Sequence, residues 1–452
     1  MKKTIKTRLL AGALCCLPVI PVSAMGAMGN LATTYGVLPT DVASAQALSM
    51  FNPQVSATYY NPSYLVRDDR GELTGALLHG EHDLRAASTG GNGFQVRSGD
   101  TLMNEPTQHT LIGMKTDISS ITKFDQPMYL GVVIGVEKYG KEMMAFESST
   151  SQQGQFVTYG REPLFLNIGG AMTLMRGLHI GGSARVTLHA DASMETVAQL
   201  DGTTSFERID VSAKPSIRPI LSATGELGEL FCGYKSNCFL SDFEVALSFR
   251  GYSNTKAGVE ANAVIPGTIN DPGLTLRLTT LDSYQPDILS LGVQYKLLDD
   301  DLRVGLTLEQ QNWSALEDEL QRDTVKDQAN LRFDDILIPR LGAEWQFRPG
   351  MYVTGGVALV PSPLKSEESL EVNYFDSDKT VIGLGGAMEF EDPYVFAYPV
   401  RLEFGYQYQL LEERDFRLTT LDPANPGPGT FYESVAADGE VHVFSGSMTL
   451  KF

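Results

Sequence analysis

Along most of the chain, apolar and polar residues alternate with a period of two, as side chains do on the two faces of a β-strand. In residues 289–297, Leu, Leu, Val, Tyr and Leu at the odd positions are separated by Ser, Gly, Gln and Lys. A short turn, Leu-Asp-Asp-Asp, leads to a second alternating segment at 302–309. Two such segments joined by a tight turn predict a β-hairpin.

The same pattern predicts an all-β fold of about fourteen antiparallel strands, each of roughly the ten residues that a bilayer-spanning strand needs. Because lipid offers no partner to a backbone N–H or C=O, such strands are expected to close into a transmembrane β-barrel. The expected strands are 72–84, 107–118, 128–139, 163–174, 178–188, 204–223, 242–256, 287–297, 302–313, 336–347, 350–361, 379–391, 397–411 and 439–452.

The expected connections alternate between long and short, an asymmetry that a soluble β-sandwich would not need. Long loops outside and short periplasmic turns are typical of outer-membrane barrels, and they place both termini in the periplasm. The expected long loops are 85–106, 140–162, 189–203, 257–286, 314–335, 362–378 and 412–438. Aromatic residues near strand ends are expected in the interfacial girdles, namely Tyr129, Tyr295, Trp313 and Tyr352.

Residues 1–24 have the features of a cleaved secretory signal peptide. A basic start is followed by an apolar stretch and then by Val22-Ser23-Ala24, the small residues that signal peptidase needs. At the other end, the last strand finishes on Phe452 and resembles the strand that the barrel-assembly machinery recognises. We therefore expect a Gram-negative outer-membrane protein that contacts membrane lipid and lipopolysaccharide.

The composition of the chain narrows the classes of protein to which it could belong. No run of about 18 apolar residues follows the signal peptide, so no transmembrane helix is expected. The formal net charge is −20, and loss of the four signal-peptide cations takes it to about −24. Such a chain is not expected to bind nucleic acid, which needs a basic surface. The acidic residues suit solvated loops, or they hold divalent cations beside lipopolysaccharide.

Two cysteines remain in the mature chain, Cys232 and Cys238, in the segment Phe-Cys-Gly-Tyr-Lys-Ser-Asn-Cys. One close pair in an exported protein predicts a disulfide. A metal site is the alternative, but no histidine lies nearby to complete a ligand set. We expect neither a metal nor a cofactor.

Residues 25–71 do not follow the strand pattern and are expected to form a plug, or hatch, inside the barrel that 72–452 would form. Here the chain resembles the FadL/TodX family of outer-membrane transporters for long-chain fatty acids and hydrophobic hydrocarbons. The resemblance is carried by Asn61-Pro62-Ser63, where the family has Asn-Pro-Ala, by Val360-Pro361-Ser362-Pro363 and by Asn312-Trp313-Ser314.

The resemblance implies a fourteen-stranded barrel plugged by an N-terminal hatch. It also implies passive movement of a hydrophobic substrate from an extracellular groove to a buried pocket, with lateral release beside a kinked strand after the hatch moves. The expected substrate is a long-chain fatty acid. A general diffusion porin for polar solutes and a structural or adhesive barrel are the alternatives.

The alternation directs several cations into the lumen, where one could bind a substrate carboxylate. Lys214, Arg218 and Arg340 are the candidates; the alternative is that these cations pair with inward-facing acids. The full set of cations is Lys214, Arg218, Lys296, Arg303, Arg340 and Arg401, and the acids are Asp210, Glu309, Glu344 and Glu403.

Apolar contacts are expected from loop 257–286, through Ile265 and Leu274, unless this loop packs on itself or extends a strand. We expect no catalytic residues, because the chain has no Gly-x-Ser-x-Gly motif and its six histidines form no evident catalytic or metal-binding group. The expected protein is a monomeric transporter and not an enzyme.

Overall fold

The structure is a computed structural model that describes residues 35–91, 106–138, 142–146, 155–159, 163–198, 204–232, 238–265, 269–298, 300–322, 331–365, 368–370, 376–422 and 425–452. The predicted signal peptide, 1–24, lies outside these residues. None of the helices in the described ranges is long and apolar enough to cross a membrane.

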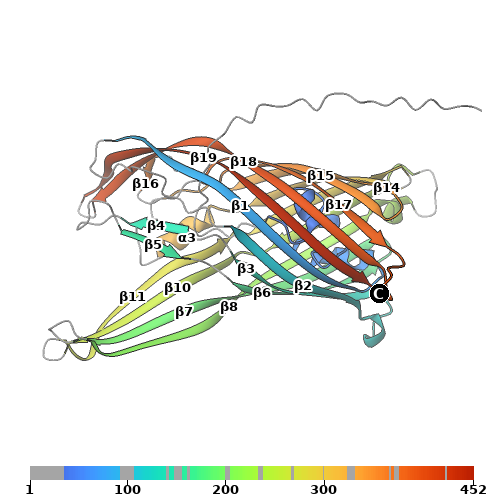
Figure 1. The fold of residues 1–452 in the computed structure, drawn as a ribbon. Coiled ribbons are helices and arrows are strands. Elements are labelled where there is room, and N and C mark those ends of the chain that lie inside the picture. Colours follow the sequence, from blue (N-terminus) through green and yellow to red (C-terminus); the bar gives the residue numbers. More distant parts are fainter. Residues whose placement is uncertain are drawn as a thin grey trace, which may run out of the picture.

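Fourteen strands of the described chain close into an antiparallel barrel, as predicted (Figure 1). The barrel closes where the first strand pairs with the last, from Glu72 opposite Lys451 to Ser88 opposite Val435. The barrel strands are β1 (Glu72–Gly90), β2 (Thr107–Asp117), β3 (Met128–Lys138), β6 (Leu164–Met175), β7 (Leu178–Ala198), β8 (Thr204–Glu226), β9 (Phe243–Arg250), β12 (Ile288–Leu297), β13 (Leu302–Gln311), β14 (Ile336–Arg348), β15 (Met351–Val360), β17 (Lys379–Phe390), β18 (Val400–Asp422) and β19 (Asn425–Lys451).

Alternation along each strand separates a lipid-facing surface from the lumen, as the sequence predicts. On β14, Leu337 and Leu341 are 55% and 50% exposed, whereas Ile338 and Arg340 between them are buried. An apolar outer face and a partly polar inner face are what a barrel in lipid requires. Glycines on the inner face let the hatch approach the wall closely.

Several expected loops are instead strand extensions at the end of the barrel that carries the long connections, here called the long-loop end. Segment 412–438, predicted as a loop, continues β18 and β19 as a hairpin. Residues 189–198, the described part of the predicted loop 189–203, likewise extend β7 opposite β8. Polar residues interrupt the apolar alternation there because strands beyond the membrane no longer need a lipid-facing side.

Segment 257–286, predicted as a loop, instead takes the alternative form of a strand extension, with β10 (Ser253–Ile265) paired to β11 (Ile269–Gln285). These strands continue β9 and β12 outward after breaks at 251–252 and 286–287. Further out, β10 pairs in parallel with β7. The two hairpins form the long projection that leaves the barrel in Figure 1.

Smaller elements occupy the remaining long connections. They are the hairpin of β4 (Glu142–Phe146) and β5 (Gln155–Tyr159), helix α3 (Ala315–Arg322) and β16 (Glu368–Leu370). The turn η3 (Ser119–Ile121) lies in the connection between β2 and β3, at the other end of the barrel. Helix α3 buries Leu316 and Leu320. With Phe333, Phe416 and Val435 these leucines form an apolar core at the long-loop end.

The hatch lies inside the barrel, where its short helices are blue in Figure 1. Its elements are α1 (Pro39–Ala43), η1 (Ser49–Phe51), α2 (Ala57–Tyr60) and η2 (Pro62–Arg67). Pro39 and Pro62 each open a helix, a position that needs no backbone N–H. The Asp41 carboxylate caps α1 by accepting a hydrogen bond of 2.9 Å from the Leu38 N–H.

Candidate functional site

A cavity of about 140 Å³ lies between the hatch and the long-loop end of the barrel. Gln46 and Tyr59 contribute to it from the hatch, and the strands from β8 to β18 with their connections contribute the rest. Its apolar wall comprises Ile288, Trp313, Ile336, Ile338, Val360 and Val381. The volume of the cavity is roughly that of a short length of hydrocarbon chain. An uncharged apolar ligand could fill the space beside these side chains without an accompanying ion.

Trp313 is central to the apolar wall and was wrongly predicted as a girdle residue. Its side chain is 8% exposed and packs against Tyr284, with ring centroids 5.9 Å apart. The indole N–H donates to the Gln311 side-chain oxygen at 2.8 Å, so its polar atom is satisfied. Trp313 lies two residues beyond the end of β13, just before α3, a feature that strand alternation cannot reveal.

Charged side chains line the cavity beside the apolar ones, but their charges pair with one another. Glu309 on β13 binds Arg250 on β9 and lies 3.5 Å from Arg340 on β14. Lys379 contacts Asp376 at 2.7 Å. These pairs favour the alternative in which lumen cations meet inward-facing acids. Arg250 was missed, although the alternation of β9 directs it inward.

Arg218 is different, because the structure gives its guanidinium no carboxylate partner among the described residues. It is 1% exposed and donates to the Gly251 carbonyl, the Pro286 carbonyl at 2.7 Å and the Gln285 side chain. Its neighbour Ile217 is 61% exposed on the outer face, so Arg218 points inward as predicted. It lines the cavity where β9 and β12 break.

The other predicted cations bind acids or the hatch. Lys296 contacts Glu244 at 3.0 Å, and Arg401 donates to Glu403 at 2.8 Å. Arg303 binds Glu344 at 2.9 Å, and Arg340 donates to the Ala45 carbonyl of the hatch at 3.0 Å. The side chains of Lys214, Ile265 and Leu274 lie outside those that the structure describes, so their contact with substrate stays a prediction.

The Asn61-Pro62-Ser63 motif attaches the hatch to the wall. The Asn61 side-chain amide donates to the Thr224 hydroxyl at 2.9 Å and to the Met50 carbonyl at 2.7 Å. The Ser63 N–H donates to the Ser222 hydroxyl at 2.8 Å. A Cβ at Gly181 on β7 would lie 2.3 Å from the Ser63 nitrogen, so the wall needs glycine there.

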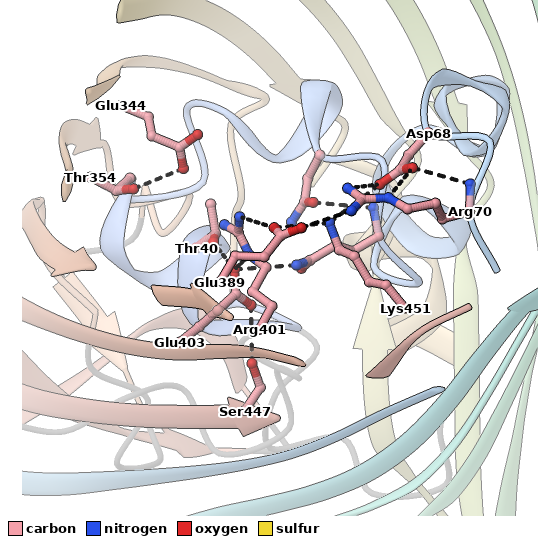
Figure 2. Close-up of polar contacts among 12 residues, drawn as sticks. Thr40, Asp68, Arg70, Glu344, Thr354, Glu389, Arg401, Glu403, Ser447 and Lys451 are labelled. Carbon is pink, nitrogen blue, oxygen red and sulfur yellow. Dashed lines mark hydrogen bonds and ion pairs between the residues drawn. The ribbon is translucent and has the colours of Figure 1, made fainter. Parts of the chain in front are cut away.

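The far end of the hatch is held by a charged network beside the short-turn end of the barrel (Figure 2). Arg70 contacts Asp68 at 3.0 Å and Glu389 on β17 at 2.8 Å. Lys451, on the last strand, lies 3.3 Å from both carboxylates. These cations, together with the Arg70 hydrogen bonds, hold the pKa of Asp68 well below its usual range, although burial opposes them.

Glu403 on β18 joins this network to α1. It accepts hydrogen bonds from the Thr40 hydroxyl at 2.8 Å and from the Gln54 amide at 3.2 Å. The Ser447 hydroxyl donates to it at 3.0 Å (Figure 2). One buried carboxylate therefore connects two hatch segments to two barrel strands, which makes hatch movement dependent on breaking several contacts together.

Two more girdle assignments are wrong, because the side chains face inward. Tyr129 is 4% exposed and donates to the Asp69 carbonyl at 3.2 Å. Tyr352 lies under the guanidinium of Arg401, 4.8 Å from the ring centroid. Both take part in holding the hatch region, and their positions follow from strand register, which places them on the inner face.

The predicted disulfide between Cys232 and Cys238 is present, with a Cα–Cα distance of 6.0 Å. It follows the π-helical turn η4 (Gly228–Cys232), after β8 at the short-turn end. Among the residues that the structure describes, no group of three or more His, Cys, Asp or Glu side chains is placed to hold a metal ion.

Comparison with known proteins agrees with this architecture. The chain is 52% identical over 439 residues to "Alkane uptake protein A" of Marinobacter nauticus, covering 96% of this chain and 93% of that protein. No family model matches the chain.

Solved structures share the fold at low sequence identity. The crystal structure of a Pseudomonas aeruginosa FadL homologue has a TM-score of 0.60 at 13% identity, covering 93% of this chain and 99% of that one. The P. putida toluene transporter TodX has a TM-score of 0.55 at 10% identity, covering 92% and 99%. The relatives are transporters and not enzymes, and the barrel belongs in the outer membrane. The chain is thus a member of the FadL/TodX family of outer-membrane transporters for hydrophobic compounds.

Proposed function

We propose that this transporter carries uncharged hydrocarbons such as alkanes through the cavity between Trp313 and the hatch. The supporting observation is the chemistry of that cavity, which apolar side chains line together with cations that are largely neutralised. Arg250 and Arg340 meet Glu309, and Lys379 meets Asp376. An alkane needs no charged partner, and the 52% identical relative is named for alkane uptake.

An apolar path explains how uptake would proceed without an energy source. A hydrocarbon is poorly soluble in water, and a water-filled pore gives it no favourable contact. Burial against Trp313, Ile336 and Ile338 removes apolar surface from water, at about 25 cal/mol for each Å². The general diffusion porin is disfavoured, because the hatch occupies the lumen.

A long-chain fatty acid is the second candidate, and Arg218 is the observation that favours it. This arginine lines the cavity and hydrogen-bonds only neutral groups in the described part of the chain. A carboxylate could replace one of those acceptors and form a stronger, charge-assisted hydrogen bond. The two candidates therefore predict different roles for Arg218.

The two tryptophans of the chain provide the test, because Trp313 lines the cavity while Trp345 is 52% exposed on the outer face. The Trp345→Phe variant would be reconstituted in lipid nanodiscs and titrated with a bromoalkane, whose bromine quenches indole fluorescence on contact. We expect saturable quenching of Trp313. The Trp313→Phe variant should show only the linear quenching of lipid partition.

A bromo fatty acid of equal chain length separates the candidates. If the cavity selects alkanes, Arg218→Met in the Trp345→Phe background should leave bromoalkane affinity unchanged, and the acid should bind no more tightly than the alkane. Tighter binding of the acid, lost in Arg218→Met, would establish the fatty acid instead. Absence of saturable quenching by either compound would refute a hydrocarbon site at Trp313.

We further infer the partners of the barrel. Its exposed apolar outer face fits the acyl chains of outer-membrane lipid and lipopolysaccharide. The last strand, ending at Phe452, fits the barrel-assembly machinery. A closed ring of strands leaves no unpaired edge that requires a second copy, which supports a monomer.

A further inference from the structure

The projection at the long-loop end is a four-stranded sheet in the order β8, β7, β10 and β11 (Figure 1). Ala192 on β7 lies opposite Val211 on β8 and, on its other side, opposite Val259 on β10. Val259 in turn lies opposite Leu278 on β11. Residues that lie opposite each other share a face of a sheet, and successive residues along a strand alternate between the two faces. These registers therefore assign each residue of the projection to a face.

One face of this sheet is apolar across all four strands. Most of its positions on β7 and β10 are alanines, which weakens the alternation of large apolar residues seen in the barrel. No charged residue falls on this face between Ala190 and Met194, or at the positions opposite them on the neighbouring strands. The larger residues of this face are Met194, Ile209, Val211, Val259, Leu276 and Leu278.

The other face of the sheet carries the charges. Glu260 on β10 lies opposite Arg277 on β11, and Glu195 on β7 lies opposite Arg208 on β8. Directly opposite residues of unlike charge stabilise an antiparallel pair. The sheet is thus amphipathic, although it has left the barrel and no longer separates lipid from a lumen.

The apolar face continues the lipid-facing side of the barrel past the membrane. Leu188 on β7 lies opposite Leu164, the first residue of β6, and both are exposed on the outer face. From Leu178 to Leu188, β7 already has the length of about ten residues that crosses a bilayer. Ala190 and Ala192 follow at every second position and so stay on the face of Leu188. They therefore lie beyond the acyl chains, at or above the polar headgroups of the outer leaflet.

The apolar face has no protein partner of sufficient size in the described part of the chain. Helix α3 packs against β11 at the base of the strand, near Tyr284. Outside the sheet, no other described element makes more than a marginal contact with β10 or β11. The largest apolar patch on a solvated surface is often a functional one, so this face calls for an occupant from outside the chain.

The size of the apolar face argues against a second copy of the chain as that occupant. With residues about 3.3 Å apart along a strand and strands about 4.8 Å apart, the face measures roughly 300 Å². Two copies would bury about 600 Å² in total, which is about half of what the smallest stable interfaces bury. A liquid hydrocarbon has no such requirement, because it wets an apolar surface without matching its shape.

We propose that this apolar face is an adsorption surface for liquid hydrocarbon outside the cell, which holds the transporter against the surface of an oil droplet. The inference rests on the proposed hydrocarbon function and adds a surface that is separate from the cavity. Liquid hydrocarbon removes the face from water, as acyl chains do for the barrel wall below it. The charged face stays in water, so the sheet lies flat on the droplet.

Two adjacent residues on β10 allow the two faces to be compared directly. Ala261→Cys introduces a thiol on the apolar face, and Asn262→Cys introduces one on the charged face. Cys232 and Cys238 are joined in the disulfide, so an environment-sensitive, membrane-impermeant dye labels the introduced thiol on whole cells. We expect hexadecane droplets to shift the dye emission to shorter wavelength at position 261 and to leave position 262 unchanged.

Two results of the dye measurement would overturn the proposal. The first is emission at position 261 that is already at short wavelength before hexadecane is added, because lipid, a second copy or the chain itself would then cover the face. The second is a droplet-induced shift that is absent from both positions or equal at both.

Adhesion of cells to hexadecane measures the consequence of adsorption. The combined variant Ile209→Thr, Val259→Thr and Leu276→Thr makes the apolar face polar while keeping residues that favour β-strands. It should lower the adhering fraction of cells several-fold. The matched control changes the next residue on each of the same strands to threonine, at Asp210, Glu260 and Arg277, and should adhere at least as well as the parent.

Equal adhesion of the two threonine variants, at matched levels of folded barrel, would also overturn the adsorption surface. Folding is checked by heat-modifiable gel mobility, and the dye comparison decides the question if the threonine variants fail to fold. In the Trp345→Phe background, both variants should keep saturable Trp313 quenching by bromoalkane. Loss of that quenching in the parent would refute the proposed function, whereas unshifted dye with intact quenching would refute the adsorption surface alone.

Discussion

The guanidinium of Arg340 donates a hydrogen bond of 3.0 Å to the Ala45 carbonyl, so the barrel wall directly holds a turn of the hatch. That turn needs external support, because Ala45 and Gln46 have φ angles of 48° and 65°. Non-glycine residues in this left-handed region cost about 1–3 kcal/mol each. The Thr307 hydroxyl supports the same turn by donating to the Ala47 carbonyl at 2.9 Å.

Arg340→Met should therefore loosen this turn while the barrel stays folded. Loss of one hydrogen bond from a charged donor costs about 2 kcal/mol, which is roughly a thirtyfold rise in the undocked population. Hydrogen–deuterium exchange across residues 43–48 should accelerate accordingly. Arg322→Met, at an exposed residue of α3, is the control and should leave that exchange unchanged. Equal protection in both variants would contradict the support assigned to Arg340.

Gly356 on β15 and its neighbour Gly355 form a natural pair for testing how tightly the hatch fits. A Cβ at Gly356 would lie 2.0 Å from the Ser44 carbonyl oxygen of the hatch, whereas one at Gly355 meets only a backbone oxygen at 3.6 Å. Gly356→Ala should displace the hatch and cost about 1–3 kcal/mol by overpacking. Gly355→Ala should be close to neutral. The stability of both variants is measured as the midpoint temperature at which the gel mobility changes from that of the folded barrel to that of the unfolded chain. Similar midpoints would show that the hatch moves readily to accommodate the added methyl group.

Docking of the hatch should weaken as the pH rises from about 4 to about 6. Burial raises the pKa of Asp41 from 3.8 to about 6. The folded hatch therefore binds a proton that the unfolded segment has already released in this range, so stability falls with increasing pH and is constant above it. This difference between the unfolded and folded pKa of Asp41 corresponds to roughly 3 kcal/mol of hatch stability.

Asp41→Asn should abolish this dependence, because its oxygen can still accept from the Leu38 N–H but no proton is exchanged. The measurement is the difference in hydrogen–deuterium exchange of α1 between the parent and the variant from pH 4 to 7.5, corrected for the intrinsic exchange rate. Other carboxylates titrate in both proteins and cancel. A constant difference across this range would show that Asp41 does not titrate there.

Alternation predicted which side of the wall each residue faces, as Leu337 and Arg340 show, because lipid and lumen impose opposite requirements. Alternation gave wrong predictions where the chain extends beyond the membrane and no longer has a lipid-facing side. Beyond the membrane, Phe416 and Val435 are fully buried in a core at the long-loop end, in a segment predicted to be a loop. The role of Trp313 also depends on how the chain folds after a strand, which period-two patterning does not encode.

The resemblance located Asn61-Pro62-Ser63, and the structure shows that these residues attach the hatch to β8. The acid that pairs with each cation could not be predicted from the sequence. Several inward-facing acids are available, and the choice among them depends on the order of the strands. Arg218 is the clearest case. Its acceptors, Gly251 and Pro286, are backbone groups at strand breaks that the sequence placed inside or beside continuous segments.

Ile338 and Leu337 offer a last test, because they are adjacent on β14 and face opposite sides of the wall. Ile338 is 1% exposed and lines the cavity, while Leu337 is 55% exposed toward lipid. Ile338→Thr keeps a β-branched shape but introduces a hydroxyl into the apolar wall. It should weaken bromoalkane binding at Trp313 about tenfold, since about 1–2 kcal/mol of favourable contact is lost.

Leu337→Thr should leave that affinity unchanged and instead lower the stability of the barrel in the bilayer, because a polar group then faces lipid. The paired readouts are saturable Trp313 quenching in the Trp345→Phe background and the midpoint of urea unfolding in vesicles. Weaker bromoalkane binding in Leu337→Thr, with Ile338→Thr unaffected, would place the hydrocarbon on the outer face of the wall and exclude the cavity as its binding site.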